Sequence, residues 1–382
     1  AAAPVQPPVR SGVDMLAAEA FAPLRGLRVG LITNHTGRDG SGRRTLELLR
    51  RAPGVKLAAL FAPEHGLDGT LDAPIASGAE PSTGLPIHSL YGAVKRPTDA
   101  MVEDLDALVF DIQDAGVRFY TYATTMAYAM EAAARRGVAF YVLDRPNPIS
   151  AAVVQGPVLD DGLRSFTGYF ALPLRHGMTL GELARMFNAE NGIGAQLVVV
   201  PMQGYRRDSW YDQTGLPWQG PSPNLRTLVQ AALYPAVGLI EGANVSVGRG
   251  TGMPFEVVGA PWIDAEKLAG YLSRRAIAGV RFEPVGFSPT ASRYREARCY
   301  GVRIHLVDRN ALDAARLGIE LAAALHRFYP GKFEIDRILH SVGSRDVLAA
   351  IKLGEDPQSV QRHWLPSLDV FIALRAKYLL YD

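Results

Sequence analysis

The chain has 382 residues, more than one ordinary domain, and its 48% hydrophobic and 20% charged residues are typical of a globular protein with a substantial core. Its formal net charge of +2 provides no basic field, so nucleic acid is not expected as a partner. Its one cysteine, Cys299, excludes an internal disulfide framework and a cysteine-rich metal site, and no run approaches the roughly 18 apolar residues of a membrane span.

The N-terminal segment 1–11 is rich in proline and small residues and is predicted to be disordered. It starts without methionine, as does the mature end that remains after removal of a signal peptide. We therefore expect an exported protein, in the periplasm or outside the cell.

Short apolar runs alternate with helical patterns between residues 12 and 222. Strands are predicted at 27–33, 55–62, 86–91, 106–112, 138–143 and 197–200, and helices at 43–51, 126–136 and 178–190. Thr179 and Glu182 have the spacing of a capping box at the start of the last helix, and Gly137 is typical of a helix C-terminus. This alternation predicts an α/β fold with a doubly wound, mainly parallel sheet.

Two segments of irregular composition interrupt this pattern. Residues 71–86 are rich in Gly, Pro, Ser and Ala without a clear period, which indicates a long functional loop. Residues 215–224, GLPWQGPSPN, are taken as a linker between domains. Residues 223–382 are then expected to form a smaller α+β domain, with helices at 264–275 and 311–326 and a strand at 300–307.

Polar side chains follow four of the predicted strands. They are Asn34 and His35, Glu64 and His65, Asp111 and Asp114, and Asp144, Arg145 and Asn147. Open parallel sheets bind ligands at the carboxyl ends of their strands, so we expect these loops to converge on one cleft.

Glu64 and His65 lie where the buried strand in LAALFAPEHG stops at Pro63. Paired carboxylates across a cleft are the groups that hydrolyse glycosides, one of them protonating the leaving oxygen. The alternative is structural, because Glu64 could cap a following element, and Asp111 and Asp114 could accept hydrogen bonds from their own loop.

Other kinds of site find less support. A metal could be held by His35, His65, His176, Asp111, Asp114 and Glu64, but no HExxH or similarly spaced pair is present. Neither a phosphate loop, nor a GxGxxG fingerprint, nor a GxSxG elbow occurs, so we expect no cofactor and no serine nucleophile. Aromatic residues in predicted loops suit the stacking of sugar rings, with core packing as the alternative; they are Phe119, Tyr120, Tyr122, Tyr169, Trp210, Tyr211 and Trp218.

A series of motifs resembles the NamZ family of exo-β-N-acetylmuramidases from residue 12 onward. In chain order they are NHTG, FAPEHG, LYG, DIQDAGVRFYTYATTM, LDRPNP, RHGMTLGELA, WQGPSPN and EGANVSVGRGTGMPFE. The resemblance implies a Rossmann-like N-terminal domain, a smaller C-terminal domain and an active site between them. It also implies a hydrolase that acts on saccharides from peptidoglycan and releases N-acetylmuramic acid from their non-reducing end by cleaving its β-1,4 bond to N-acetylglucosamine.

The resemblance places the family's PEHG glutamate on Glu64, as the general acid. The second carboxylate is predicted to be Asp111, Asp114 or Glu241, unless the substrate's own acetamido oxygen acts at the anomeric carbon. A bidentate arginine is the natural ligand of the lactyl carboxylate of muramic acid. The candidates for the arginine and for other contacts to the substrate are Arg118, Arg145, Arg249, Asn34, His35, His65, Tyr120, Asp144, Asn147 and His176. A metal-dependent hydrolase in the same cleft and a non-catalytic muropeptide-binding protein are the alternative functions.

Overall fold

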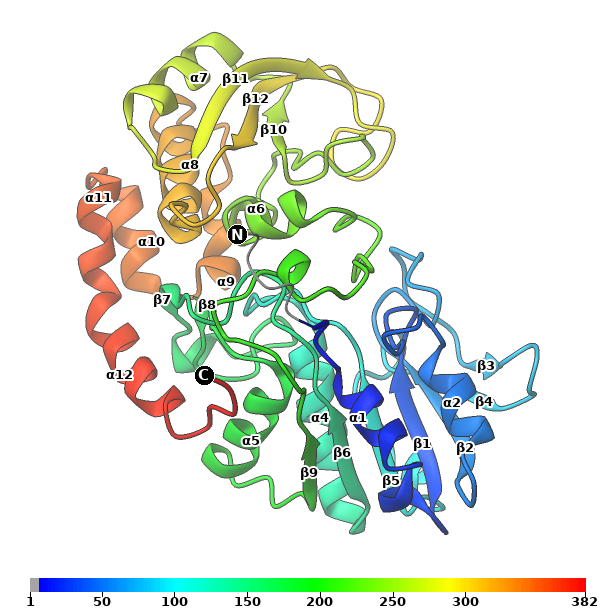
Figure 1. Cartoon of the computed structure of the whole chain (residues 1–382). Coiled ribbons are helices and arrows are strands. Elements are labelled where there is room, and N and C mark those ends of the chain that lie inside the picture. The colour runs from blue at the N-terminus through cyan, green and yellow to red at the C-terminus, as the bar shows by residue number, and fades with distance from the viewer. Residues whose placement is uncertain (1–6) are drawn as a thin grey trace, which may run out of the picture.

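The computed structural model describes residues 7–382 (Figure 1). The N-terminal domain, up to the linker, contains α1 (Gly12–Ala18), β1 (Arg28–Thr33), α2 (Thr45–Arg51), β2 (Lys56–Ala62), β3 (Gly78–Ala79), β4 (Pro86–Ser89), α3 (Asp99–Val102), β5 (Ala107–Asp111), α4 (Tyr122–Arg136), β6 (Ala139–Leu143), β7 (Gln155–Val158), β8 (Pro173–Arg175), α5 (Leu180–Glu190) and β9 (Leu197–Val200).

The predicted parallel sheet is confirmed. The strand order is β3-β4-β2-β1-β5-β6-β9, and all neighbours pair in parallel except the short edge strand β3. Without β3, the six parallel strands have the order 3-2-1-4-5-6 of a doubly wound nucleotide-binding fold. The fold is therefore Rossmann-like, although the chain carries no dinucleotide fingerprint.

Both faces of this sheet are covered by helices. Val29 and Leu31 of β1 pack in one hydrophobic cluster with side chains of α1 and α2, whereas Ile32 belongs to a second cluster with side chains of α4 and α5. Successive side chains of a strand point to opposite faces, so the apolar runs in the sequence correspond to strands buried on both sides.

The helix predicted at 126–136 begins one turn earlier, at Tyr122. Its C-terminus is as expected, because Gly137 adopts the left-handed conformation with φ 66°. The capping box of α5 is also confirmed, since the Thr179 hydroxyl accepts from the Glu182 amide at 3.3 Å and the Glu182 carboxylate accepts from the Thr179 amide at 3.0 Å. The earlier start of α4 matters because it places Thr121 at the N-terminus of a helix.

The C-terminal domain is α+β, as predicted. It contains α6 (Leu228–Val237), β10 (Val257–Ala260), α7 (Ala265–Arg274), β11 (Val280–Phe287), β12 (Cys299–Leu306), α8 (Ala314–Phe328), α9 (Leu339–Val342), α10 (Arg345–Lys352), α11 (Pro357–Val360) and α12 (Leu365–Arg375). Its sheet is antiparallel, in the order β10-β12-β11, and α7 packs against this sheet and against α8 (Figure 1). The strands β10 and β11 were not predicted from the sequence.

The two domains share one hydrophobic core and several polar contacts. Arg118, before α4, donates to the carbonyl oxygens of His340, Ser341 and Val342 at 3.2, 2.8 and 3.0 Å. The C-terminal segment returns to the N-terminal domain, where the Tyr381 hydroxyl donates to Asp144 Oδ2 at 2.6 Å. The domains are therefore fixed against each other by buried contacts.

Residues 7–11 are ordered, contrary to the prediction for 1–11. The Val9 amide donates to the Thr214 carbonyl at 2.8 Å, and Arg10 pairs with Gln203 in an antiparallel bridge. The prediction failed because it considered local composition and not this tertiary pairing. The remainder of that prediction, for residues 1–6, lies outside the described residues.

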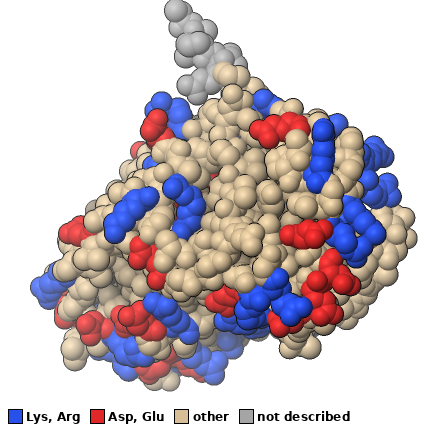
Figure 2. Space-filling view, turned by 90° about the horizontal axis from the view of Figure 1, so that it is seen from below, with Lys and Arg blue, Asp and Glu red and all other residues tan. Residues whose placement is uncertain are grey.

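Acidic and basic side chains are interspersed on the surface. Figure 2 shows the face seen from below in Figure 1, where Lys and Arg lie between Asp and Glu around an uncharged area. Within residues 7–382, the structure has no helix that is long and apolar enough to cross a membrane.

Candidate active site

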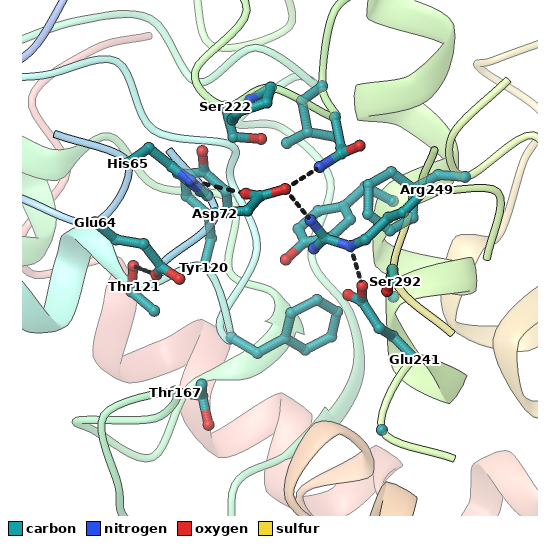
Figure 3. A pocket seen from close by; sticks show the side chains of 18 of the residues that line it. Glu64, His65, Asp72, Tyr120, Thr121, Thr167, Ser222, Glu241, Arg249 and Ser292 are labelled. Carbon is teal, nitrogen blue, oxygen red and sulfur yellow. Dashed lines mark hydrogen bonds and ion pairs between the residues drawn. The ribbon is translucent and has the colours of Figure 1, made fainter. Parts of the chain in front are cut away.

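A cavity of about 820 Å³ lies between the two domains and the linker (Figure 3). The N-terminal domain contributes Glu64, His65, Asp72, Tyr91, Phe119, Tyr120, Thr121 and Thr167 to its wall. The C-terminal domain contributes Tyr234, Glu241, Arg249, Phe255 and Ser292, among others, and the segment Ser222 to Arg226 closes the wall between them. The predicted linker is thus part of the site.

Glu64 reaches the cavity because the chain turns sharply after β2. Pro63 follows the last residue of the strand, and His65 and Gly66 are both left-handed, with φ 71° and 76°. This conformation is uncommon for a histidine, so tertiary contacts must hold it. His65 Nδ1 lies 2.7 Å from the Leu71 carbonyl oxygen, and this contact fixes the turn that presents Glu64.

Two hydroxyl groups surround the Glu64 carboxyl group. The Thr121 hydroxyl donates to Glu64 Oε2 at 2.6 Å, from the N-terminus of α4. Tyr91 lies in the loop after β4, and burial together with the negative charge of Glu64 raises the pKa of its phenol to about 12. Tyr91 is therefore a neutral hydrogen-bond donor beside Glu64 at neutral pH.

Asp72 is a second carboxylate on the cavity wall. Its Oδ1 lies 3.1 Å from His65 Nδ1, and its Oδ2 accepts from Asn224 Nδ2 at 3.0 Å and lies 3.7 Å from Arg249 Nη1. The hydrogen bond with His65 is the largest cause of a lowered pKa for Asp72, to which Arg249 also contributes. Figure 3 shows this carboxylate between His65 and Arg249, and it stays ionised at neutral pH.

Glu241 is the third carboxylate, on the opposite side of the cavity from Glu64 (Figure 3). It forms an ion pair with Arg249, whose guanidinium also lies 5.4 Å from the centre of the Phe255 ring. Burial lowers the pKa of Arg249, but the charge of Glu241 outweighs it and raises the pKa overall. Two carboxylates thus already compensate the charge of Arg249.

Arg226 is an exposed cation at the rim of the cavity. Its Nη2 donates to the Thr251 carbonyl oxygen at 2.9 Å. No carboxylate within residues 7–382 lies within 4.0 Å of its guanidinium. Arg226 therefore offers a positive charge that the protein itself does not neutralise.

Aromatic rings form much of the remaining wall. Tyr234 packs edge-to-face against Phe119, Tyr120 and Phe255, with ring centres 5.2, 5.9 and 4.7 Å away. Of the aromatic residues singled out in the sequence, Phe119 and Tyr120 line the cavity, whereas Trp210 and Tyr211 are buried in the core. A wall of this kind offers apolar faces next to hydrogen-bonding groups, as a sugar ring requires.

Asp111 and Arg145 do not line the cavity. Asp111 is completely buried, where it accepts from Arg145 Nη2 at 2.9 Å and from the Thr45 hydroxyl at 2.5 Å. This position does not fit the expected catalytic role of Asp111 or the expected contact of Arg145 with substrate. The pair instead ties the end of β5 to the loop after β6, and Arg145 Nη2 also donates to the Arg38 carbonyl oxygen, in the loop after β1, at 2.7 Å.

Asp114 and His176 are also buried outside the cavity wall. Asp114 Oδ2 accepts from the Gly116 amide at 2.8 Å and lies 3.7 Å from His176 Nε2. His176 Nδ1 in turn accepts from the Met178 amide at 3.2 Å. Neither side chain is placed to touch a sugar in the cavity, contrary to the expectation for both.

The other predicted contacts are hydrogen-bonded within the protein. Asn34 bonds with Tyr122 and Thr36, His35 with Gly220, Asn147 with Met178 and Ile149, and Asp144 with Thr179, Gly181 and Tyr381. Arg118 contacts α9, and burial lowers its pKa to about 10. None of these five side chains lines the cavity, so of the four loops expected there only those after β2 and β5 reach it, whereas Tyr91 reaches it from the loop after β4.

Several residues of the wall were not singled out in the sequence. Asp72 belongs to the segment 71–86, which was expected to be a functional loop, and Tyr91 belongs to the LYG motif. Thr121 lies within the long motif that begins at Asp111, and Arg226 is the second residue after the linker. Their position within or next to a motif was the sequence signal that could have identified these residues.

A two-domain α/β protein whose interdomain cavity combines carboxylates with aromatic rings has the equipment of a carbohydrate-active hydrolase. The models of the exo-β-N-acetylmuramidase NamZ family match this chain over residues 29–229 for the N-terminal domain and 232–381 for the C-terminal domain. The chain belongs to the NamZ family, as the motifs predicted.

Known relatives share this similarity over nearly their whole length. The peptidoglycan β-N-acetylmuramidase NamZ of Bacillus subtilis strain 168 is 42% identical over 385 aligned residues, which cover 98% of this chain and 92% of the relative. A crystal structure of a DUF1343 family protein from Bacteroides fragilis NCTC 9343 superimposes with a TM-score of 0.91 at 37% identity and covers 100% of both chains. A second one from the same strain has a TM-score of 0.82 at 32% identity, covering 98% of this chain and 99% of the other.

Proposed function

We propose that this protein is an exo-acting glycoside hydrolase that releases N-acetylmuramic acid from the non-reducing end of peptidoglycan fragments, by cleaving the β-1,4 bond to N-acetylglucosamine. Membership of the NamZ family and the similarity to the Bacillus subtilis enzyme support this activity. The observation that carries the mechanism is the position of Glu64, on the cavity wall and hydrogen-bonded to Thr121.

Glu64 is proposed as the general acid. Protonation of the glycosidic oxygen lets the sugar alcohol leave as a neutral molecule, which is the usual task of one carboxyl group in a glycosidase. Thr121 can hold one oxygen of Glu64, so that the other is oriented toward the substrate. A carboxyl group fixed in this way loses little conformational freedom when the substrate binds.

Asp72 is proposed as the second carboxylate. Positive charge develops at the anomeric carbon in the transition state of glycoside hydrolysis, and an ionised carboxylate stabilises it. The lowered pKa of Asp72 keeps it ionised, and of the two carboxylates Glu241 forms the closer ion pair with Arg249. If Asp72→Asn hydrolyses a chromogenic β-N-acetylmuramide as fast as the wild type, Asp72 does not have this role.

Arg226 is proposed to bind the lactyl carboxylate of the terminal muramic acid. Arg118 and Arg145 do not line the cavity, and Arg249 is neutralised by Glu241 and Asp72. Arg226 is at the rim without a carboxylate partner among the described residues, so an anionic substituent of the sugar would complete its coordination.

The test of the activity is turnover. Purified protein should release N-acetylmuramic acid from the disaccharide of N-acetylmuramic acid and N-acetylglucosamine, detected by mass spectrometry, and Glu64→Gln should not. The absence of any release by the wild type would leave only the binding-protein alternative, which family membership does not favour.

The metal-dependent alternative is tested with a chelator. No group of three or more His, Cys, Asp or Glu side chains between residues 7 and 382 is arranged to hold a metal ion. Full activity after exhaustive chelation would eliminate this alternative.

Export to the compartment that contains peptidoglycan stays a prediction from the N-terminal sequence.

A further inference from the structure

A row of aromatic side chains leads out of the cavity along the N-terminal domain. Tyr91 lines the cavity, its ring centre lies 6.0 Å from that of Phe166, and Phe166 lies 6.1 Å from Tyr128. Tyr128 lines a second cavity of about 500 Å³. All three side chains are half-buried, so each still presents part of its ring to solvent.

A tight hairpin holds Phe166 between the two cavities. The amides of Ser165 and Gly168 each donate to the carbonyl oxygen of the other at 3.0 Å, which places Phe166 and Thr167 at the tip. Thr167 lines the cavity with Glu64, and Ser165 lines the second one. The two cavities therefore border the same tight turn.

Two cations lie over these rings. Lys95 Nζ is 4.4 Å from the centre of the Phe166 ring and 5.9 Å from that of Tyr91, and the guanidinium carbon of Arg96 is 3.5 Å from the centre of Tyr128. Arg96 forms an ion pair with Glu131. Lys95 is exposed, and no carboxylate lies within salt-bridge distance of it in the described part of the chain. We call Tyr91, Lys95, Arg96, Tyr128 and Phe166 the aromatic shelf.

We propose that the aromatic shelf is a second saccharide site, which binds the next muramic acid unit of the glycan. This inference rests on the proposed function, in which the terminal muramic acid occupies the cavity with Glu64. In an alternating glycan the sugar after the scissile bond is N-acetylglucosamine, and the one after that is again a muramic acid with a carboxylate. Aromatic rings with an unpaired ammonium group above them suit such an acidic sugar. The rings can contact the apolar face of the sugar, and the ammonium group can pair with its carboxylate.

The test measures binding, so that it does not depend on turnover. In the Glu64→Gln background, the tetrasaccharide of two alternating N-acetylmuramic acid and N-acetylglucosamine units should bind more tightly than the disaccharide. Lys95→Glu should weaken tetrasaccharide binding by about fivefold to tenfold and leave disaccharide binding unchanged, since the substitution removes an exposed charge pair and adds repulsion. Raising the salt concentration from about 0.01 to 1 M shortens the Debye length from about 30 to 3 Å. The tetrasaccharide should then no longer bind more tightly than the disaccharide.

Lys56→Glu is the matched control, because Lys56 is exposed at the start of β2, at the opposite end of that strand from Glu64. The variant Phe166→Ala tests the contribution of the aromatic rings to tetrasaccharide binding. Circular dichroism verifies that this variant is folded. The proposal would be overturned if the Glu64→Gln protein with an unchanged aromatic shelf bound the disaccharide and the tetrasaccharide with equal affinity. It would also be overturned if Lys95→Glu weakened the binding of the two saccharides equally. Competition by a free stem peptide at the concentration of the tetrasaccharide would also overturn it, because the shelf would then be a peptide site. Failure of the wild type to hydrolyse the disaccharide would count against the proposed function instead.

Discussion

The substitution Glu64→Gln changes the proposed general acid with little change in shape. Glutamine keeps an oxygen that can accept the hydrogen bond from the Thr121 hydroxyl, which joins the two side chains at 2.6 Å. Glu64 lies on the wall of a cavity and not in the core, so the fold should tolerate the amide. In the proposed mechanism, the function that is lost is the transfer of a proton.

The size of the effect follows from the leaving group. General acid catalysis contributes about 10² to 10⁴ in rate, which corresponds to about 3–5 kcal/mol at 1.36 kcal/mol for each factor of ten. N-acetylglucosamine leaves as a basic alkoxide unless it is protonated, so hydrolysis of the disaccharide should lose this whole factor. A nitrophenolate leaves without protonation, so the chromogenic β-N-acetylmuramide should lose about tenfold or less.

The assay compares kcat for both substrates in the wild type and in Glu64→Gln. Glu80→Gln is the control, since Glu80 lies on the same β2–β4 connection but outside the cavity. Equal losses on the two substrates would refute the role of proton donor and indicate a role in positioning or as nucleophile. A wild-type rate on the disaccharide would remove Glu64 from the mechanism.

Three further predictions concern the neighbours of Glu64 and the buried network. Thr121→Val should lower kcat on the disaccharide about tenfold with KM unchanged, because Glu64 loses a hydrogen bond of about 1–1.5 kcal/mol. Arg226→Ala should lower kcat/KM for the muramide about tenfold to a hundredfold relative to the matching N-acetylglucosaminide, since a hydrogen bond to a charged group contributes about 1.5–3 kcal/mol. Burial raises the pKa of Asp144 to about 6 from an ordinary 3.8. Because the folded protein favours the protonated carboxyl group, this group stabilises the fold by roughly 3 kcal/mol below about pH 4. This stabilisation is lost as the pH rises to about 6. Urea unfolding at pH 4 and pH 7 should therefore show that the free energy of unfolding of the wild type falls with rising pH relative to Asp144→Asn.

Each of these three predictions would be contradicted by a specific experimental result. Thr121→Ser keeps the hydroxyl and should restore most of the rate, so a Ser variant as slow as Val would argue against a hydrogen-bonding role. Arg206→Ala, at an exposed site with its own partner Asp208, is the control for Arg226→Ala. Equal losses on the muramide and the glucosaminide would mean that Arg226 does not recognise the lactyl group. A pH-independent stability difference between wild type and Asp144→Asn would mean that Asp144 does not titrate near pH 6 in the folded protein.

Most of the N-terminal domain could be predicted from the sequence because its strands are buried on both faces. Such strands are uninterrupted apolar runs, as in LAALF and DALVF, and turn-forming residues end them. The strand β11 could not be recognised, since Pro284 interrupts it and its exposed face carries charged residues. The start of α4 was missed because β-branched and aromatic residues fill its first turn, and only its contacts with the rest of the protein make it helical.

The candidate site could be predicted in part. Glu64, His65, Tyr120, Glu241 and Arg249 do line the cavity. The other polar side chains at strand ends are engaged by partners from distant segments, such as Tyr381 for Asp144. A polar residue that faces a ligand and one that bonds a neighbouring loop have the same local sequence pattern, so the sequence alone cannot separate them.

The hydrophobic core that continues through both domains has a consequence for engineering. It joins side chains of α4 and α5 to those of α6 and α8, and Tyr381 of the C-terminal segment adds a hydrogen bond to Asp144, which follows β6. Exchanging the C-terminal halves of two relatives at the linker would therefore mismatch a packed interior, at about 25 cal/mol for each Å² of apolar surface left exposed. New substrate preferences are better sought by substitution at the tip of the hairpin at residues 165–168, where Thr167 lines the cavity and lies outside that core.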